Sequence, residues 1–238
     1  MSTPPAGGRV VLWDFDGTLA ERPGLWSRCL IETLDEAAPD HGVTADDLRP
    51  HLAGGFPWHR PERLHPELSE PEAWWASVES LLARSYRGVG IEPERARALA
   101  RVARARYVDP TVGWRLFPDT VPVLERLRGR GWRHVILSNH VPELEVLVAG
   151  LGLAPLVDRV LTSASIGAEK PHPAAFEQAL AAAGRPGEVW MVGDNETADV
   201  AGAEAVGIPA ILVRREPTAA ARRAGDLEAA AALIEAGV

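Results

Sequence analysis

Five short segments rich in apolar residues recur along the chain, each four or five positions long. Short apolar segments of this kind are typical of strands that are buried on both faces of a parallel sheet. The sequence therefore predicts five parallel strands. They are expected at residues 10–13, 134–138, 159–162, 189–192 and 210–213.

The segments between the later strands have a helical periodicity instead. In residues 118–129, Val121, Leu124 and Leu127 recur at intervals of three residues, and Gly129 closes the segment. Apolar residues at this spacing share one face of a helix, and glycine is common where a helix ends. Strands that alternate with helices predict an α/β fold with a doubly wound parallel sheet.

The alternation is interrupted between about residues 20 and 112, where no convincing strand occurs. Helices are expected there at residues 26–37, 71–86 and 93–108. Prolines and aromatic residues limit the freedom of residues 54–66 and predict an ordered irregular loop. We therefore predict an α/β core formed by residues 1–19 and 113–238. Residues 20–112 are predicted to form a helical insertion that hangs over the end of the first strand as a lid.

The composition is that of a globular protein with an acidic balance. The 238 residues are 46% hydrophobic and carry a formal charge of −8, which disfavours nonspecific binding to nucleic acid because such binding depends on basic contacts to phosphate. No apolar run approaches the length of a membrane span or a signal-peptide core. The lone Cys29 is interpreted as a small buried hydrophobe. We expect a cytoplasmic protein whose tail, residues 216–238, adds one or two helices to the sheet.

Two carboxylates follow the first predicted strand in the segment Asp14-Phe-Asp16-Gly17. The carboxyl ends of parallel strands are where open α/β sheets bind their ligands. Gly17 allows the chain to turn, so that Asp16 can curl over the end of the strand. A close pair of acids favours a hard divalent cation, and we expect Mg²⁺. One carboxylate could attack a substrate while the other transfers a proton, although an ordinary Asp-Gly turn is the alternative for this motif alone.

A single lysine stands among the 25 basic residues of the chain, and all the others are arginine. This residue, Lys170, lies in the segment Ala168-Glu-Lys-Pro171. A lysine ammonium is a compact charge that can be directed at one oxygen, whereas a guanidinium is planar and larger. The bias therefore predicts that Lys170 occupies a tight space that excludes arginine. A leftover surface lysine is the alternative.

Two other predicted strands end in residues suited to phosphoryl chemistry. One ends in Ser138 and Asn139, where a hydroxyl and the N–H groups of a helix start can bind a phosphoryl oxygen or simply cap the helix. Another is followed by Asp194, the expected metal ligand, and by Asp199. Asp199 is expected to support the metal site by orienting a bound water, or to interact with a helix dipole.

These segments together resemble, in order, the four motifs of the haloacid dehalogenase-like hydrolase superfamily. The motifs are Asp14-Phe-Asp16-Gly17-Thr18, Ser138-Asn139, Lys170-Pro171, and Gly193-Asp194 with Asp199. The resemblance covers the whole chain, and a helical insertion between the first and second motifs is similar to the subclass with an α-helical cap. It implies a Rossmann-like core of three α/β/α layers around a parallel sheet.

The resemblance also implies a set of catalytic roles. Asp14 would attack phosphorus to form an aspartyl-phosphate, and Asp16 would act as acid and base. The Mg²⁺ ion would be bound by the side chain of Asp14, the backbone carbonyl of Asp16 and the side chain of Asp194.

The substrate's phosphoryl group would be held by the remaining motif residues. Lys170 and Ser138 would neutralise and hold the phosphoryl oxygens, with Asn139 beside them and Lys170 paired to Asp14. Thr18 is expected to support Asp16 through its hydroxyl and to lie at the substrate.

The expected function is therefore a phosphatase of small phosphorylated metabolites. A 2-haloacid dehalogenase is a weaker alternative, because those relatives usually lack an acid at the position of Asp16. A phosphosugar mutase shares the core residues, although the predicted cap contains no lysine. A phosphate-binding regulatory protein without turnover is the non-enzymatic alternative. The sequence leaves the oligomeric state open.

Substrate selection is expected to come from polar and aromatic residues of the insertion. Trp74 and Trp75 are adjacent and cannot share one helix face, so one is expected in the core and the other at the cleft or a partner. Arginines at positions 97, 101 and 104 are interpreted as a solvated helix face. The candidates for specificity are Trp26, Phe56, Trp58, His59, Arg60, Arg63, His65, Trp74 and Trp75.

Overall fold

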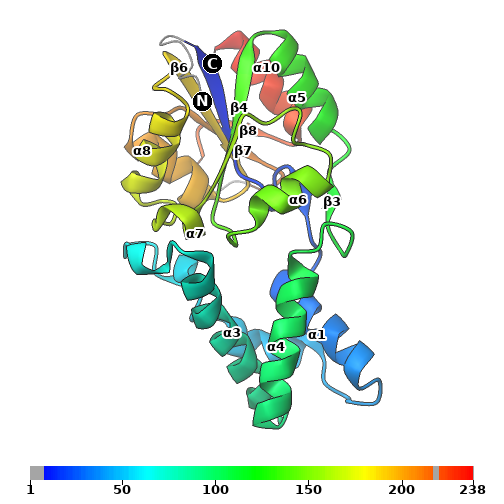
Figure 1. The fold of residues 1–238 in the computed structure, drawn as a ribbon. Coiled ribbons are helices and arrows are strands. Elements are labelled where there is room, and N and C mark those ends of the chain that lie inside the picture. Colours follow the sequence, from blue (N-terminus) through cyan, green and yellow to red (C-terminus); the bar gives the residue numbers. More distant parts are fainter. Residues whose placement is uncertain (1–7, 217–219, 238) are drawn as a thin grey trace.

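The computed structural model describes residues 8–216 and 220–237. Its main sheet has six parallel strands in the order β5-β4-β1-β6-β7-β8, shown in Figure 1. The five predicted strands are all present. The strands are β1 (Arg9–Trp13), β4 (Trp132–Ser138), β5 (Arg159–Thr162), β6 (Glu188–Gly193), β7 (Ala210–Val213) and β8 (Arg223–Ala224).

Strand β8 lies in the tail, where only helices were predicted. It is two residues long, and it pairs with β7 by placing Arg223 opposite Leu212 and Ala224 opposite Val213. So short a segment has no alternation that sequence could reveal. The predicted helix of the tail is present as α10 (Leu227–Ala236), while residues 217–219 and 238 of that prediction lie outside the described residues.

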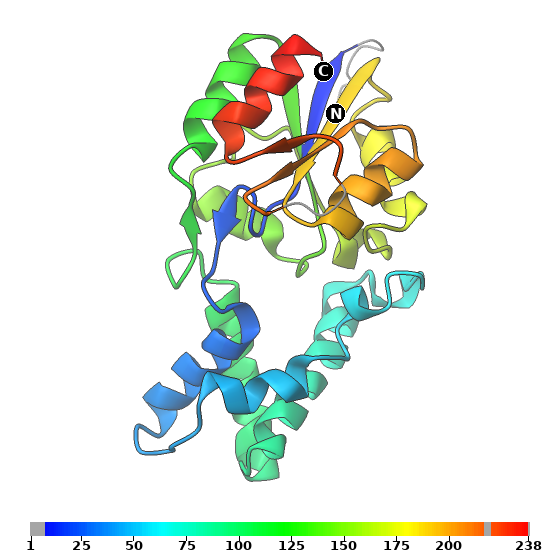
Figure 2. The same cartoon turned by 180° about the vertical axis from the view of Figure 1, so that it is seen from behind.

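Helices cover both faces of the sheet and produce the three layers that were predicted (Figures 1 and 2). Side chains on β1 alternate between the two faces: Val11 and Trp13 belong to one apolar core, and Val10 and Leu12 belong to the other. The first core is covered by α5 (Thr120–Gly129) and α10, with α6 (Leu144–Gly150) beside them. The second is covered by α8 (Pro173–Ala182), η3 (Glu196–Ala201) and α9 (Gly202–Ala205). A short helix, α7 (Ser163–Ile166), follows β5.

Residues 22–114 form a helical insertion that projects below the sheet in Figures 1 and 2. Its base is an antiparallel pair of short strands, β2 (Ala20–Glu21) and β3 (Arg115–Leu116). No strand was expected between about residues 20 and 112, and β2 shows that this expectation was wrong at the start of that range. The helices are α1 (Leu25–Ala37), α2 (Ala45–Leu52), α3 (Pro71–Gly88) and α4 (Pro93–Tyr107), with 3₁₀ turns at Pro57–His59 and Pro66–Leu68. None of the helices in the described part of the chain is long and apolar enough to cross a membrane.

Helix α2 was not predicted, since it is short and contains Pro50. Its start is stabilised by a capping box: the Thr44 side chain accepts a hydrogen bond from the Asp47 N–H, and the Asp47 carboxylate accepts one from the Thr44 N–H at 2.8 Å. This capping signal is visible in the sequence as a threonine followed three residues later by an aspartate.

Aromatic side chains form the core of the helical insertion. Trp26 stacks on Tyr107 with ring centroids 3.7 Å apart. Trp74 and Trp75 are both buried, which corrects the expectation that one of them faces the cleft or a partner. Arg104 is likewise not a free surface residue, because it pairs with acidic side chains and lies 4.6 Å from the centre of the Trp75 ring. Arg97 and Arg101 are exposed, as predicted.

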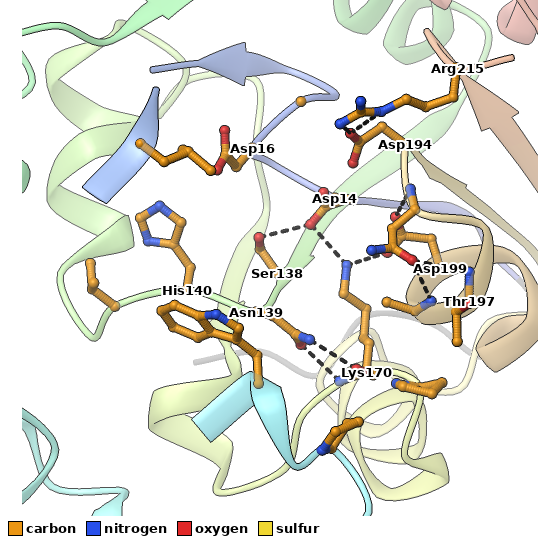
Figure 3. A pocket seen from close by; sticks show the side chains of 18 of the residues that line it. Asp14, Asp16, Ser138, Asn139, His140, Lys170, Asp194, Thr197, Asp199 and Arg215 are labelled. Carbon is orange, nitrogen blue, oxygen red and sulfur yellow. Dashed lines mark hydrogen bonds and ion pairs between the residues drawn. The ribbon is translucent and has the colours of Figure 1, made fainter. Parts of the chain in front are cut away.

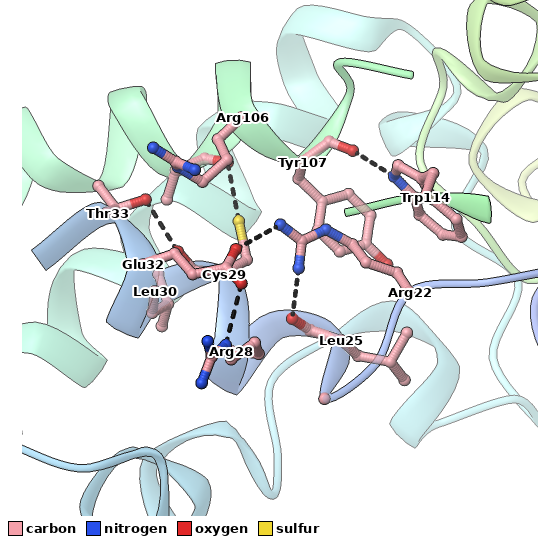
Figure 4. Close-up of polar contacts among 12 residues, drawn as sticks. Arg22, Leu25, Arg28, Cys29, Leu30, Glu32, Thr33, Arg106, Tyr107 and Trp114 are labelled. Atoms are coloured by element: carbon pink, nitrogen blue, oxygen red, sulfur yellow. Dashed lines mark hydrogen bonds and ion pairs between the residues drawn. The ribbon is translucent and has the colours of Figure 1, made fainter. Parts of the chain in front are cut away.

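Buried Arg22 fixes the base of the insertion, as Figure 4 shows. Its guanidinium donates to the Leu25 carbonyl at 3.5 Å and to Glu32 at 3.0 Å, and it lies 5.6 Å from the centre of the Tyr107 ring. The Trp114 indole N–H donates to the Tyr107 carbonyl at 2.8 Å. Arg22 and Trp114 lie where the chain enters and leaves the insertion, and these contacts join them to its first and last helices, α1 and α4.

Candidate active site

The carboxyl ends of β1, β4 and β6 bring the predicted motif residues to one edge of the sheet. Asp14 follows β1, and its N–H donates to the Val192 carbonyl of β6 at 2.9 Å, which continues the ladder by one residue. Gly17 then turns the chain with a φ of +84°. A Cβ at Gly17 would lie 2.4 Å from an Asp194 oxygen, so the turn needs glycine both for its backbone conformation and for this close approach.

One oxygen of Asp14 receives two hydrogen bonds. Oδ1 accepts from the Ser138 hydroxyl at 2.8 Å and from Nζ of Lys170 at 2.8 Å (Figure 3). No hydrogen bond to Oδ2 occurs within the described residues. Asp14 is therefore held through one oxygen, while the other remains available to a ligand.

Lys170 is buried in a tight space, as its rarity in the sequence predicts, and its partners there are acidic. The residue is only 2% exposed, and its ammonium contacts both Asp14 and Asp199. The second oxygen of Asp199 accepts the Asn195 N–H at 2.9 Å. A Cβ at Gly193 would lie 2.1 Å from this Asp199 carboxylate, so only glycine allows the approach.

Asn139 positions the backbone of Lys170. Its side-chain N–H donates to the Lys170 carbonyl at 2.9 Å, and its side-chain oxygen accepts the Lys170 N–H at 2.8 Å. This pair of bonds joins the end of β4 to the loop after α7. Asn139 also lines the cavity described below, and its role in substrate binding stays a prediction.

Three carboxylates lie close enough to hold a metal ion. Oxygen atoms of Asp14, Asp194 and Asp199 are all within 4.8 Å of one another. Arg215 contacts the same group, because its Nε and Nη2 donate to Oδ2 of Asp194 at 3.0 and 2.8 Å. Arg215 was not predicted as a site residue, since it lies after the last predicted strand and only the fold brings it here.

Burial and the charges of neighbouring residues shift the pKa values of the ionisable side chains at this edge of the sheet. Burial, together with the charges of Asp14 and Asp194, raises the pKa of Asp16 well above its usual value. Burial also raises the pKa of Asp199, while the ion pair with Lys170 opposes that shift. Burial acts to lower the Lys170 pKa, but the charges of Asp14 and Asp199 outweigh it, so this pKa is raised. The lysine therefore stays charged at neutral pH.

A cavity of about 450 Å³ separates these carboxylates from the helical insertion. The sheet edge contributes Asp14, Asp16, Ser138, Lys170 and Asp194, and the insertion contributes Leu25, Trp26, Trp58, Pro61 and Tyr107. Of the candidates for specificity, Trp26 and Trp58 thus line the cavity.

Two predicted side chains have other surroundings. Thr18 is completely buried, and its hydroxyl has no hydrogen-bond partner in the described part of the protein, so the expected bond to Asp16 is absent. His65 is buried against Glu169, outside the cavity wall.

His140 is a cavity residue to which the sequence analysis assigned no role. It is 3% exposed, and neither of its ring nitrogens has a hydrogen-bond partner among the described residues. Its ring packs edge-on against Phe15, with centroids 5.6 Å apart, and tilts against Trp114 at 5.5 Å. Burial lowers its pKa to about 4, against the attraction of Asp14, so the imidazole is neutral at physiological pH.

Comparison with known proteins identifies the family. A model of the haloacid dehalogenase-like hydrolases matches residues 9–207. Phosphoserine phosphatase of Thermus thermophilus is 33% identical over 229 residues, which cover 87% of this chain and 89% of that protein. The chain therefore belongs to the haloacid dehalogenase-like hydrolase family, as its motifs predicted.

The chain is also similar to a second phosphatase in sequence and to a dehalogenase in structure. Phosphoglycolate phosphatase of Rhodospirillum rubrum is 30% identical over 226 residues, covering 89% of this chain and 83% of that protein. The crystal structure of 2-haloacid dehalogenase from Pseudomonas syringae superposes with a TM-score of 0.68 at 23% identity, covering 97% of this chain and 100% of that chain. The structural likeness to the dehalogenase concerns the fold.

Proposed function

We propose that the protein is a magnesium-dependent phosphatase that hydrolyses small phosphomonoesters through a phosphorylated Asp14. The position of Asp14 carries this proposal: Ser138 and Lys170 hold Oδ1, and the carboxylate faces the cavity. A carboxylate fixed in this way can attack without first having to be oriented. The relatives named as phosphatases support the same reaction.

The reaction we propose has two steps. In the first, Oδ2 of Asp14 attacks phosphorus, the bond to the alcohol oxygen breaks, and Asp16 donates a proton to the departing alkoxide. In the second, Asp16 accepts a proton from water as that water attacks the phosphorus of the aspartyl-phosphate. Asp14 and inorganic phosphate are then released. Lys170 and Ser138 hold the phosphoryl oxygens in both steps.

The carboxylates at the sheet edge fit a hard divalent cation, since such ions prefer oxygen ligands. We propose that the side chains of Asp14 and Asp194 and the backbone carbonyl of Asp16 hold Mg²⁺. Asp199 would support the site through Lys170, to which it is paired. The bound metal would reduce repulsion between the anionic nucleophile and the anionic phosphate.

The alternatives fit the site less well. A haloacid dehalogenase does not need the proton that Asp16 supplies, because a halide leaves as an anion. A phosphosugar mutase shares the core residues, yet no lysine occurs in the insertion to grip a second anionic group. A regulatory protein that binds phosphate without turnover would not need both Asp14 and Asp16 at the cavity.

We further propose that residues 20–112 act as a cap over a core formed by residues 1–19 and 113–238. A contact between the two parts supports this. The Trp75 indole N–H of α3 donates to the Glu143 carboxylate, at the start of α6, at 2.8 Å. Such a cap can exclude bulk water from an acyl phosphate and admit only alcohols that fit.

The natural substrate is proposed to be a small phosphorylated metabolite. The charge of −8 disfavours nucleic acid as a partner. A lone reduced thiol, Cys29, is compatible with a reducing compartment, and we propose the cytoplasm. The structure describes one chain, so the oligomeric state stays open.

The test is phosphate release from a panel of small phosphomonoesters, with Mg²⁺ and with a chelator. We expect metal-dependent release by the wild type, and a loss of at least about 10³-fold in Asp14→Asn, because the amide is a poor nucleophile. Circular dichroism and thermal unfolding would show that the variant is folded. Halide release from 2-haloacids and interconversion of phosphosugar isomers are assayed in parallel. Phosphate release that persists in folded Asp14→Asn would overturn the mechanism.

A further inference from the structure

The wall of the cavity opposite the carboxylates carries no charge. Within the described residues, the insertion contributes Leu25, Trp26, Trp58, Pro61 and Tyr107, whose polar side-chain groups are two indole N–H groups and one hydroxyl. This wall faces the space that the alcohol portion of a phosphate ester would fill. Its aromatic and aliphatic surfaces favour a flat apolar alcohol.

The cations of the cavity are already paired with acidic groups. Lys170 contacts Asp14 and Asp199, and Arg215 donates twice to Asp194. No other lysine or arginine lines the cavity in the described part of the chain. An alcohol that carries a carboxylate would therefore meet no cation on the wall formed by the insertion, and burying a carboxylate against that wall would be unfavourable.

Leu25 lines the cavity with an apolar side chain, and its backbone has a strained, left-handed conformation. It is 40% exposed and has a φ of 44°, directly after Gly24 with a φ of 75°. Residues other than glycine rarely adopt this left-handed conformation, and a strained residue of this kind is often found where a ligand binds. A bound apolar group would cover the exposed leucine.

His140 lines the cavity, and neither of its ring nitrogens has a hydrogen-bond partner among the residues that the structure describes. Figure 3 shows it on the Asp16 side of the cavity, where the alcohol would leave. Buried polar groups without a hydrogen bond are rare, and a ligand that supplies the missing partner gains the bond at little extra desolvation cost. A neutral imidazole can donate from one nitrogen and accept at the other, so it matches a hydroxyl or an amine.

We propose that the cavity takes phosphomonoesters of flat, largely apolar alcohols that carry one uncharged hydrogen-bonding group, and that His140 recognises this group. The proposal rests on the phosphatase function proposed above and names its substrate class. It separates this chain from enzymes whose substrate carries a carboxylate beside the phosphate. In this role His140 determines specificity, and it does not take part in the proton transfers.

The test compares three esters: benzyl phosphate, 3-hydroxybenzyl phosphate and 2-phosphoglycolate. The two benzyl esters have leaving alcohols of similar acidity and differ by one hydroxyl, so a difference in kcat/KM reports recognition of that hydroxyl. We expect the wild type to prefer the hydroxybenzyl ester over the benzyl ester by about tenfold, the value of one buried hydrogen bond. Both should exceed 2-phosphoglycolate.

Two variants of His140 identify the residue responsible. His140→Phe should reduce the preference for the hydroxybenzyl ester over the benzyl ester to about one, whereas His140→Gln, which can still hydrogen-bond, should retain part of it. Binding of 3-hydroxybenzylphosphonate and benzylphosphonate to folded Asp14→Asn, measured by calorimetry, should show the same ratio without turnover. Trp58→Ala should weaken both phosphonates.

The possible failures are distinguishable. If no ester releases phosphate, the proposed function fails and this inference fails with it. If phosphate is released but 2-phosphoglycolate is the best substrate, the function stands and the inference about the substrate class is wrong. A preference for the hydroxybenzyl ester that survives in His140→Phe would overturn the role of His140.

Discussion

Nε2 of His65 lies 3.0 Å from Oε1 of Glu169, and this contact joins the loop between α2 and α3 to the residue that precedes Lys170. The backbone N–H of His65 also donates to the Gly167 carbonyl at 2.9 Å. Both residues are buried, at 6% and 0% exposed. The insertion is thus attached to the sheet domain beside the only lysine of the chain.

The His65–Glu169 contact predicts a pH-dependent stability. The hydrogen bond to Glu169 raises the pKa of His65 above 6.5, while burial opposes that shift. Because the folded state binds the proton more tightly, this stabilisation is fully present below about pH 6.5 and is lost as the pH rises through the folded pKa. Thermal unfolding should therefore show a larger deficit of His65→Gln relative to wild type at pH 6 than at pH 9.

His51→Gln provides the matched control for this prediction, since His51 is an exposed histidine of α2. Its difference from wild type should be small at both pH values. A deficit of His65→Gln that is the same at pH 6 and pH 9 would show that the His65 proton does not contribute.

Replacement of Lys170 by arginine should impair turnover even though charge is kept. The residue is 2% exposed between Asp14 and Asp199, and the larger planar guanidinium cannot place one nitrogen between both carboxylates. We expect kcat/KM to fall by about 10²–10³-fold, as when a preorganised donor is removed. Arg97→Lys, an exposed exchange between the same two residue types, should retain full activity. Near-normal rates for folded Lys170→Arg would contradict the prediction.

Arg215 should compete with the metal for Asp194. Its guanidinium contacts Oδ2 of Asp194, while most of its side chain is exposed. Arg215→Ala is expected to lower the half-saturating Mg²⁺ concentration by about fivefold, which corresponds to the ~1 kcal/mol attraction of a solvated pair. The measurement is a Mg²⁺ titration of phosphate release, with the exposed Arg223→Ala as the control. A higher Mg²⁺ requirement in Arg215→Ala would show that Arg215 assists the metal site.

Cys29 should report the opening of the helical insertion. Its thiol is completely buried and donates to the Ala103 carbonyl at 3.4 Å, and burial raises its pKa to about 12. At pH 8 the thiolate is scarce, so a disulfide reagent should react roughly a thousandfold more slowly than with the unfolded chain. The rate is measured in increasing urea. A fast reaction in native buffer would show that α1 separates readily from α4.

Much of the fold could be predicted from local patterns. The five apolar runs are strands because their residues are buried on both faces of the sheet, and Val10 and Val11 of β1 show this directly. The three helices predicted in the insertion begin and end within two residues of α1, α3 and α4. The pair β2–β3 and strand β8 are too short to leave any periodicity, so only the pairing of distant segments reveals them.

The sequence by itself determined the residue types at the candidate site. Asp14, Ser138, Lys170 and Asp194 follow strands or stand out by rarity, and parallel strands bring their carboxyl ends to one edge. This inference needs only the chemistry of each residue and the order of the strands.

Only the tertiary structure decided which side chains lack partners and which meet across the chain. His140 packs against the rings of Phe15, Tyr107 and Trp114, and its nitrogens have no partner among the described residues. His65 contacts Glu169, which lies 104 positions away in the sequence. Such contacts depend on how the helical insertion packs against the sheet edge. Local propensity and periodicity describe neighbours along the chain, so they carry no information about that packing.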